Sequence, residues 1–256
     1  PYRYNRHRKK CGGETGFMKK FIAFSFDDGT TQDIRLTALL KKYSFSATFN
    51  LNTGLLGETT DLSSLGIKAQ HIRLTKAEIE SGIYSGFETA VHTLCHPLLT
   101  ALSDDEVISQ INDDAQNIFS LTGVHPKGMA YPGGGEDSFD DRIISLIKSK
   151  TSIKYARIGQ TTGNFDFPKD PLRWKGTCTV TDGRLLTLGQ NFLRQKQGLF
   201  LIWGHSYELD MGDGWNRFEK FLKLMDSDKD VCRASCGQVY DYLIDRASEQ
   251  LPQFNG

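Results

Sequence analysis

Phe21-Ile22-Ala23-Phe24-Ser25-Phe26 is an apolar run that ends at Asp27-Asp28-Gly29. A short continuous apolar run bounded by turn residues is typical of a strand buried on both faces, as in a parallel sheet. After this run, the apolar residues between positions 36 and 43 recur at helical spacing and would lie on one face of a helix. The stretch therefore predicts a strand followed by a helix, with two carboxylates at the carboxyl end of the strand.

The same alternation of apolar runs and amphipathic stretches continues along the chain. Capping-box sequences open two helices after Thr75 and Ser103, and apolar stripes predict further helices over residues 139–147 and 215–225. Residues 159–183 are rich in turn-forming residues and predict no clear element. Further strands are predicted at residues 47–51, 90–92, 128–131, 155–157 and 199–203. Repeated strand–helix units over ~235 residues favour an α/β fold, a distorted (β/α) barrel of about seven strands.

The composition is that of an ordinary globular chain. The 256 residues carry 31 Lys and Arg against 31 Asp and Glu, and AVILMFWYC residues make up 38%. This apolar content excludes a disordered chain, and the zero net charge argues against a general nucleic-acid-binding surface. The longest apolar run, residues 199–203, is far shorter than the ~20 residues that span a bilayer. We expect a monomer without a membrane span and without a nucleic-acid partner.

Residues 1–20 differ from the rest of the chain. Their basic cluster, residues 3–10, lacks the apolar run that an intact signal peptide requires. We interpret residues 1–20 as a linker or a vector-derived stretch, with a nucleic-acid-binding arm as the alternative, and residues 21–256 as one domain. The five cysteines are too few and too scattered for a disulfide scaffold. No second ligand-spaced pair accompanies Cys232 and Cys236, so we expect structural thiols.

Several chemically reactive residues follow the carboxyl ends of predicted strands. Asp27 and Asp28 follow the first strand, His92 the third, Pro132-Gly133 the fourth and His205 the last. In β/α barrels the active site lies at this rim, on loops from different strands. Each feature alone is weak evidence: the aspartates could form only a turn, an isolated pair such as His92 and His96 is a ligand set in a minority of cases, and His205 could be a hydrogen-bonded core residue. Their common location favours one active site at the carboxyl-terminal rim.

The segment His92-Thr93-Leu94-Cys95-His96 places two imidazoles four residues apart. Two imidazoles and a carboxylate give a divalent ion three ligands and leave a coordination position open. Such an ion lowers the pKa of a bound water and polarises a carbonyl, and a second carboxylate can accept the proton. The rim therefore predicts one divalent ion, Zn²⁺ first, with Co²⁺, Ni²⁺ or Mn²⁺ as alternatives. His71 and His125 have no such setting and are assigned to the surface or to loops.

These motifs resemble those of the polysaccharide deacetylases with a NodB homology domain, carbohydrate esterase family four. The family's first motif, an apolar-Thr/Ser-Phe-Asp-Asp-Gly string, resembles residues 24–29, and its second, His-Ser/Thr-x-x-His, resembles residues 92–96. Its last, an apolar-x-His string at a strand end, resembles residues 202–205. The resemblance spans about residues 21–242 and implies a distorted (β/α) barrel.

The resemblance also implies roles for individual residues. Asp27 would be the general base, Asp28, His92 and His96 the metal ligands, and His205 the general acid. The commonest form of the third motif has an Arg followed by a Pro-rich turn. This chain instead has residues 129–134, Met-Ala-Tyr-Pro-Gly-Gly, so the arginine that orients the base is missing. The string Ala-Tyr-Pro-x-Gly within this segment does occur in the family.

Other residues are candidates for the remaining roles, including that of the missing arginine. The backbone N–H of Gly133 would help to stabilise the oxyanion. Arg157 ends the next predicted strand and is a candidate to replace the missing arginine; a solvated surface arginine is the alternative. Trp174 lies in the region of the fourth motif, and Tyr131 and Trp203 are further candidates to stack on sugar rings. Core packing is the alternative for these aromatic residues.

The implied activity is the removal of N- or O-linked acetyl groups from a carbohydrate. Chitin oligomers, peptidoglycan and acetylated xylan all suit the motifs, and a polymeric substrate favours the cell envelope or the extracellular space. A catalytically weak carbohydrate-binding member of the same fold is the alternative. A serine hydrolase is disfavoured, because Glu208 stands where the nucleophile elbow requires Gly.

Overall fold

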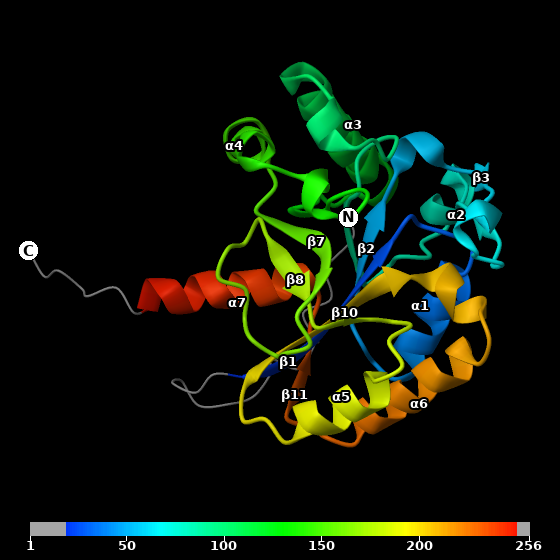
Figure 1. The fold of residues 1–256 in the computed structure, drawn as a ribbon, viewed down its shortest axis with the longest axis vertical. Coiled ribbons are helices and arrows are strands. Elements are labelled where there is room, and N and C mark those ends of the chain that lie inside the picture. The colour runs from blue at the N-terminus through cyan, green and yellow to red at the C-terminus, as the bar shows by residue number, and fades with distance from the viewer. Residues whose placement is uncertain (1–18, 250–256) are drawn as a thin grey trace, which may run out of the picture.

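A parallel sheet forms the centre of the fold in the computed structural model, which describes residues 19–249 (Figure 1). β1 (Lys20–Asp27) lies between β2 (Thr48–Leu51) and β10 (Gly198–His205) and pairs in parallel with both. The sheet continues past β2 and past β10, and β11 adds beside β1. The remaining strands are β5 (Glu88–Val91), β6 (Gly128–Ala130), β7 (Tyr155–Thr161), β8 (Trp174–Gly176), β9 (Cys178–Thr179) and β11 (Val231–Arg233).

Residues 159–183, for which the sequence predicts no clear element, almost close this sheet into a barrel. Only Thr177 separates β8 from β9; β8 pairs with β7 at one end of the sheet, and β9 pairs with β10 at the other. The Thr177 N–H also donates a hydrogen bond to the Leu201 carbonyl at 2.7 Å. The distorted (β/α) barrel is confirmed. Its described part has eight strands in succession rather than the expected seven, because this turn-rich segment supplies two short strands.

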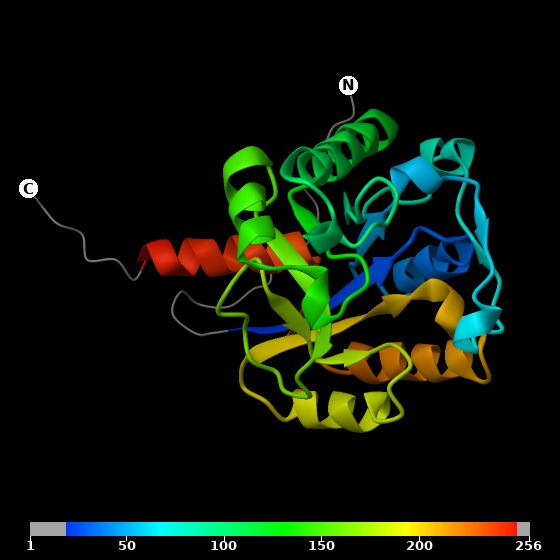
Figure 2. The ribbon, with the colours of Figure 1, turned by 45° about the horizontal axis from the view of Figure 1, so that its top comes forward.

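Helices join the strands and cover the barrel. Figure 2 shows α5 and α6 on one side of the sheet and α3 and α4 on the other. The predicted capping boxes are confirmed, at Thr75 before α2 and at Ser103 before α3. The α-helices are α1 (Asp33–Lys42), α2 (Lys76–Glu80), α3 (Asp104–Thr122), α4 (Asp141–Lys150), α5 (Leu185–Leu193), α6 (Gly214–Asp226) and α7 (Cys236–Glu249). Short 3₁₀ helices are η1 (Thr53–Leu55), η2 (Ser63–Leu65), η3 (Leu99–Ala101), η4 (Glu136–Ser138) and η5 (Ser206–Asp210).

Both faces of β1 are buried, which explains its continuous apolar run. Ile22, Phe24 and Phe26 pack into the larger apolar cluster, which includes the buried faces of several helices. Phe21 and Ala23 alternate with them and pack into a second cluster, together with side chains of β7, β8 and β10. Because β7 and β8 are not neighbours of β1 in the sheet, this second face points across the interior of the barrel.

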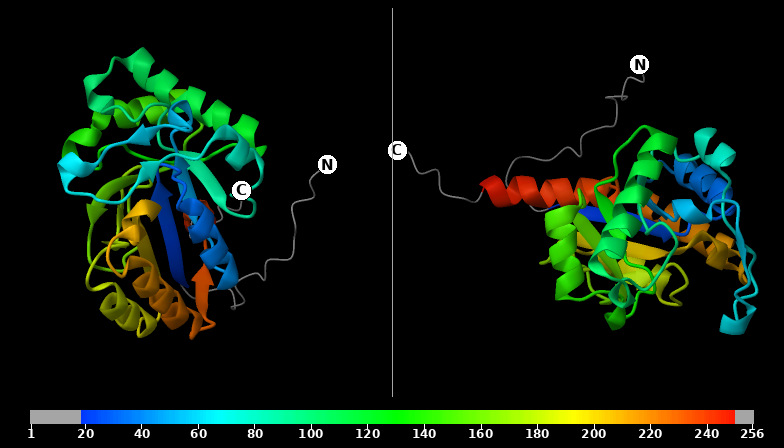
Figure 3. Two further views of the ribbon diagram at one scale, coloured as in Figure 1. Left: turned by 90° about the vertical axis from the view of Figure 1, so that its right-hand side faces the viewer. Right: turned by 90° about the horizontal axis from the view of Figure 1, so that it is seen from above.

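An excursion between β2 and α2 stands at one side of the barrel (Figure 3). It contains an antiparallel hairpin of β3 (Thr59–Thr60) and β4 (His71–Ile72), which the sequence did not predict. Two backbone hydrogen bonds of 2.8 Å fasten the hairpin to the loop after β1, from Thr31 N to Ile72 O and from Leu74 N to Gly29 O. The hairpin therefore lies beside the strand end that carries the aspartate pair.

Other predictions concern the chain as a whole. None of the described helices is long and apolar enough to cross a membrane. Three of the four cysteines of residues 19–249 are buried, and Cys95 is exposed. The basic cluster, and almost all of the segment interpreted as a linker, fall on residues 1–18, outside the described residues.

Candidate active site and metal centre

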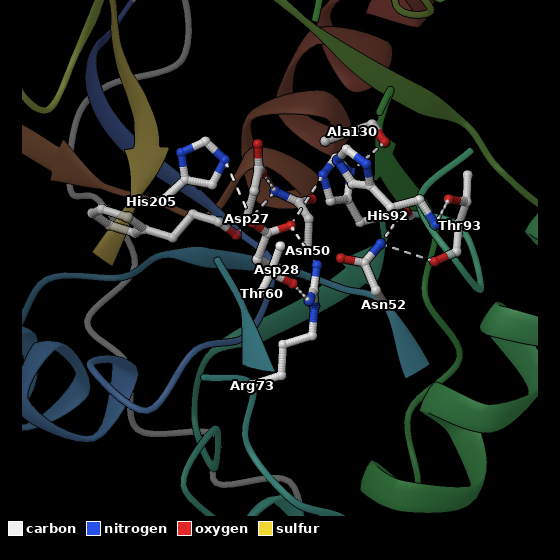
Figure 4. A network of polar contacts seen from close by, with 12 residues as sticks. Asp27, Asp28, Asn50, Asn52, Thr60, Arg73, His92, Thr93, Ala130 and His205 are labelled. Carbon is white, nitrogen blue, oxygen red and sulfur yellow. Dashed lines mark hydrogen bonds and ion pairs between the residues drawn. The ribbon is translucent and has the colours of Figure 1, made fainter. Parts of the chain in front are cut away.

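The strand ends bring the predicted reactive residues together at one rim of the barrel. Figure 4 shows Asp27 at the end of β1 and Asp28 directly after it, His92 after β5 and His205 at the end of β10, all facing a common centre. One ligand atom each from Asp28, His92 and His96 lie within 4.8 Å of one another. These are the three predicted metal ligands.

The backbone is sharply turned at these ligands. Among the described non-glycine residues, φ is positive at Asp28 (74°), Thr93 (64°), His96 (56°) and one other position, Ser44. Such a conformation costs of order 1–3 kcal/mol and persists only where the surrounding structure holds it. Three of the four cases lie in the ligand-bearing loops, where they aim side chains from two strands at one point.

His92 is held with one ring nitrogen directed into the site. Its side chain is buried, and Nδ1 lies 2.9 Å from the Ala130 carbonyl, which can only accept a hydrogen bond. Nδ1 therefore carries the hydrogen, and Nε2 keeps a lone pair for a ligand. Asp114 accepts the His92 N–H at 3.2 Å, and the Asn52 amide donates to the Thr93 carbonyl at 3.0 Å. These contacts fix the loop that carries both imidazoles.

Asp28 has its two oxygens in different surroundings. Oδ2 accepts a hydrogen bond from His71 Nε2 at 2.8 Å, whereas Oδ1 is buried without a hydrogen-bond partner among the described residues. Oδ1 lies 3.8 Å from both His92 Nε2 and Arg73 Nη2. Burial would raise the pKa of Asp28, but the His71 hydrogen bond and the surrounding positive groups, His205 first, hold it well below its usual value.

The assignment of His71 to the surface or to a loop was wrong. His71 is buried, and its side chain contacts a predicted metal ligand. Sequence reasoning missed His71 because it lies on β4 of the excursion and not after a predicted strand. His125, in contrast, is exposed and stacks on Phe119, as expected of a surface residue.

Asp27 is bound through both carboxylate oxygens. Oδ2 accepts from Arg157 Nη2, and Oδ1 accepts from Asn50 Nδ2 at 2.8 Å. Arg157 also donates from Nε to Ser25 Oγ at 3.1 Å, across the barrel from β7 to β1. Burial alone would raise the pKa of Asp27, but the Arg157 guanidinium and the nearby imidazoles lower it below its usual range. Arg157 is thus no solvated surface residue: it is 2% exposed.

The three aromatic residues considered for sugar stacking lie in different surroundings. The rings of Tyr131 and Trp174 are each 1% exposed, and the Trp174 ring stacks on Tyr155 in the core. Their burial argues against a sugar-binding role, because a ring inside the core presents no face to a ligand. Trp203 is partly exposed and lies under the Arg157 guanidinium, 4.6 Å from ring centroid to Cζ.

His205 lies between two acidic groups. Its Nε2 is 3.7 Å from Asp28 Oδ2, and its Nδ1 is 3.6 Å from Glu208 Oε2, which accepts the His205 backbone N–H at 2.9 Å. Burial would lower the pKa of His205, but Glu208 and the two aspartates raise it to about 9. Sequence reasoning missed Glu208, although its place three residues after His205 was visible.

Gly133 lies in the turn that follows β6. Its φ of 80° is in the region that favours glycine, and the residue is exposed. A Cβ at this position would meet only Leu98, at 3.7 Å. The backbone conformation, and not crowding, therefore accounts for glycine here.

Residues 15–152 match the family model described as Polysaccharide deacetylase, which is more than half of the chain. This chain belongs to the polysaccharide deacetylase family. Peptidoglycan-N-acetylmuramic acid deacetylase PdaC of Bacillus subtilis is 32% identical over 139 residues, which are 53% of this chain and 25% of PdaC. Chitin deacetylase 1 of Cryptococcus neoformans is 26% identical over 167 residues, 61% of this chain and 32% of that protein. The chain thus matches about a quarter to a third of the length of these curated relatives.

Solved structures of the family share the fold. The structure of peptidoglycan deacetylase PdaC from Bacillus subtilis superposes with a TM-score of 0.54 at 22% identity, covering 93% of this chain and 98% of that one. A CE4 family pseudoenzyme from Bacillus anthracis superposes with a TM-score of 0.51 at 17% identity, covering 80% of this chain and 61% of that one. At these identities the likeness supports the barrel and does not assign an activity.

The donor set of this polysaccharide deacetylase family member fits a divalent ion. Asp28 Oδ1 is a buried carboxylate oxygen that no described residue hydrogen-bonds, and His92 Nε2 has its lone pair directed into the site. Burial and the neighbouring His92 lower the pKa of His96 to about 4, so His96 is neutral near pH 7, as a metal ligand must be. Two imidazoles and a carboxylate with an open position suit Zn²⁺ and related ions.

Proposed function

We propose that the chain is a metal-dependent hydrolase that removes N- or O-linked acetyl groups from a carbohydrate. One observation carries the proposal: the adjacent aspartates have opposite surroundings. Asp27 has both oxygens bound by Arg157 and Asn50, whereas Asp28 keeps one oxygen beside the imidazoles that accepts no hydrogen bond from the described part of the chain. This contrast supports a general base next to a metal ligand. We assign the activity to residues 21–256 and to an acetylated oligo- or polysaccharide substrate, with the chain acting as a monomer.

Asp28, His92 and His96 would hold the ion, with Zn²⁺ as the first candidate. When bound, such an ion lowers the pKa of a water molecule and polarises the acetyl carbonyl. Asp27 accepts the proton of the attacking water through its carboxylate. Arg157 keeps that carboxylate ionised and in place, and so fills the role of the arginine that Ala130 cannot supply. The backbone N–H of Gly133 donates to the oxyanion that forms.

His205 supplies the proton that the departing sugar needs. The carboxylates around it keep the imidazole protonated near neutral pH, with a pKa of about 9. Glu208 lies on the Nδ1 side of the ring and therefore leaves Nε2 to face the reacting centre. Trp203, partly exposed beneath Arg157, is the aromatic residue that remains available to contact a sugar.

Replacing Arg157 by Ala is expected to lower kcat/KM by about 100-fold, because a small displacement of the base suffices for such a loss. The bound metal content should stay unchanged, since Arg157 contacts Asp27 and none of the three proposed ligands. Arg184→Ala is the matched control, because it removes an exposed arginine that also pairs with an aspartate, Asp182. An unchanged rate in a folded Arg157→Ala protein would rule out the replacement role and favour the weak-catalyst alternative.

The experiment that tests the function is acetate release from a panel of glycans by zinc-loaded protein. The panel holds peptidoglycan fragments and chitin oligomers, the substrate classes that the relatives' names indicate, together with acetylated xylan. We expect release from at least one class. Glycan binding without acetate release from any of them would identify the catalytically weak carbohydrate-binding member instead.

A further inference from the structure

We propose that His71 is a positioning residue of the metal site, which holds one oxygen of Asp28 so that the other faces the imidazoles. The inference deepens the proposed function and rests on it. It concerns a residue outside the family motifs described above, carried by an excursion whose strands have two residues each.

The hairpin holds His71 in place through backbone contacts on both sides of residue 73. Ile72 O accepts from Thr31 N, and Leu74 N donates to Gly29 O, each at 2.8 Å. Arg73 forms an isolated antiparallel bridge with Thr30 between these two bonds. The hairpin is therefore fastened to the residues that directly follow Asp28, and the two side chains are fixed relative to each other.

The contact itself is short and buried. His71 Nε2 lies 2.8 Å from Asp28 Oδ2, and the side chains of the two residues are 2% and 7% exposed. A carboxylate oxygen only accepts, so Nε2 carries the hydrogen and donates it. A nitrogen that donates its hydrogen to a carboxylate has no lone pair for a metal, which separates His71 from the three ligands.

Neighbouring groups hold the imidazole and leave the other oxygen open. The rings of His71 and Tyr207 pack edge to face, with 4.9 Å between centroids and 72° between planes. On the opposite side of the carboxylate, Asp28 Oδ1 has no hydrogen-bond partner within residues 19–249, and Arg73 Nη2 is 3.8 Å away. One oxygen is thus bound and one is open, so the carboxylate is oriented before any ion binds.

This arrangement has a measurable consequence for metal affinity. Groups that orient a metal ligand through a hydrogen bond typically contribute about 10–100-fold in affinity. Without the donor, the Asp28 carboxylate can turn about its side-chain torsion, and part of its orientation must then be fixed by the ion itself. We expect a loss in this range when the donor is removed.

The test compares His71→Gln with His71→Asn. The glutamine amide nitrogen extends about as far as Nε2 of histidine and can donate to Asp28, whereas the asparagine amide is one bond shorter and cannot reach it. We measure Zn²⁺ affinity by competition with a chromophoric chelator, without any substrate. His71→Asn should weaken Zn²⁺ binding by about 10–100-fold, and His71→Gln should stay close to the wild-type protein.

Controls separate this inference from the function on which it rests. His125→Asn changes an exposed histidine and should leave Zn²⁺ affinity unchanged. If His71→Asn does not fold, as judged by circular dichroism, His71→Leu replaces it, because leucine removes the donor but fills the contact with Tyr207. Unchanged affinity in the variant that lacks the donor would overturn the inference.

Two further outcomes also count against His71 as a donor. Equal losses in His71→Gln and in the donor-free variant, with an altered Co²⁺ absorption spectrum, would make His71 a ligand. Wild-type protein that binds no Zn²⁺ would overturn the proposed metal site and this inference with it. If Zn²⁺ binding is lost in Asp28→Ala but unchanged in the His71 variant that lacks the donor, this inference is overturned while the proposed metal site stands.

Discussion

Replacing Asp27 by Asn is expected to reduce acetate release to near background while metal binding stays intact, whereas Asp28→Ala should lose both. Asparagine is close to aspartate in shape and keeps an oxygen for Arg157, but it cannot take a proton from the attacking water. Loss of a general base alone costs about 10²–10⁴-fold. Asp28 belongs to the three-residue cluster and carries the open oxygen, so its removal takes away a ligand.

The measurement combines metal content after dialysis with acetate release from the best glycan of the panel. Chelator treatment of the wild-type protein should abolish activity, and added Zn²⁺ or Co²⁺ should restore it in the wild type but not in Asp27→Asn. Equal metal loss in the two variants would mean that the roles of the aspartates are wrongly assigned. Full activity of metal-free wild-type protein would exclude a metal-dependent reaction altogether.

The rim site could be predicted because its residues follow strands with strong patterns. The apolar run before Asp27 is buried on both faces, and its alternation sends Phe24 and Phe26 towards the helices and Ser25 and Asp27 towards the interior. Parallel strands end at the same rim, so His92 and His205 join the aspartates although they are 64 or more positions away in the sequence.

The rest depends on tertiary contacts that no local pattern specifies. His71 lies on a two-residue strand, too short to show any period, and its burial comes from docking against the loop after β1. Tyr131 and Trp174 are buried by packing that the sequence alone does not reveal, since aromatic residues suit cores and binding surfaces equally. Arg157 was predicted to reach the rim as the last residue of its strand, but β7 continues to Thr161. Arg157 instead contacts Asp27 from within β7, across the interior of the barrel.

Replacing His205 by Ala is expected to affect amide and ester substrates differently. An amide nitrogen cannot leave as an anion, so N-deacetylation needs a proton as the C–N bond breaks. A sugar alkoxide is a far better leaving group and departs with less help. His205 lies beside the aspartate pair with its Nε2 towards Asp28 and a pKa of about 9, so it can deliver that proton.

We therefore expect His205→Ala to lower kcat/KM for N-acetylated sugars by about 10²–10⁴-fold, the usual contribution of general acid catalysis. O-acetyl esters should retain a clearly larger fraction of the wild-type value. The two losses, each converted to a transition-state free energy, are compared within one protein preparation, so differences in folding or metal content cancel. Metal content of the variant is measured in parallel, because Nε2 lies 3.7 Å from the proposed ligand Asp28. If the ester loses as much as the amide, His205 positions the substrate or the metal and does not donate the proton.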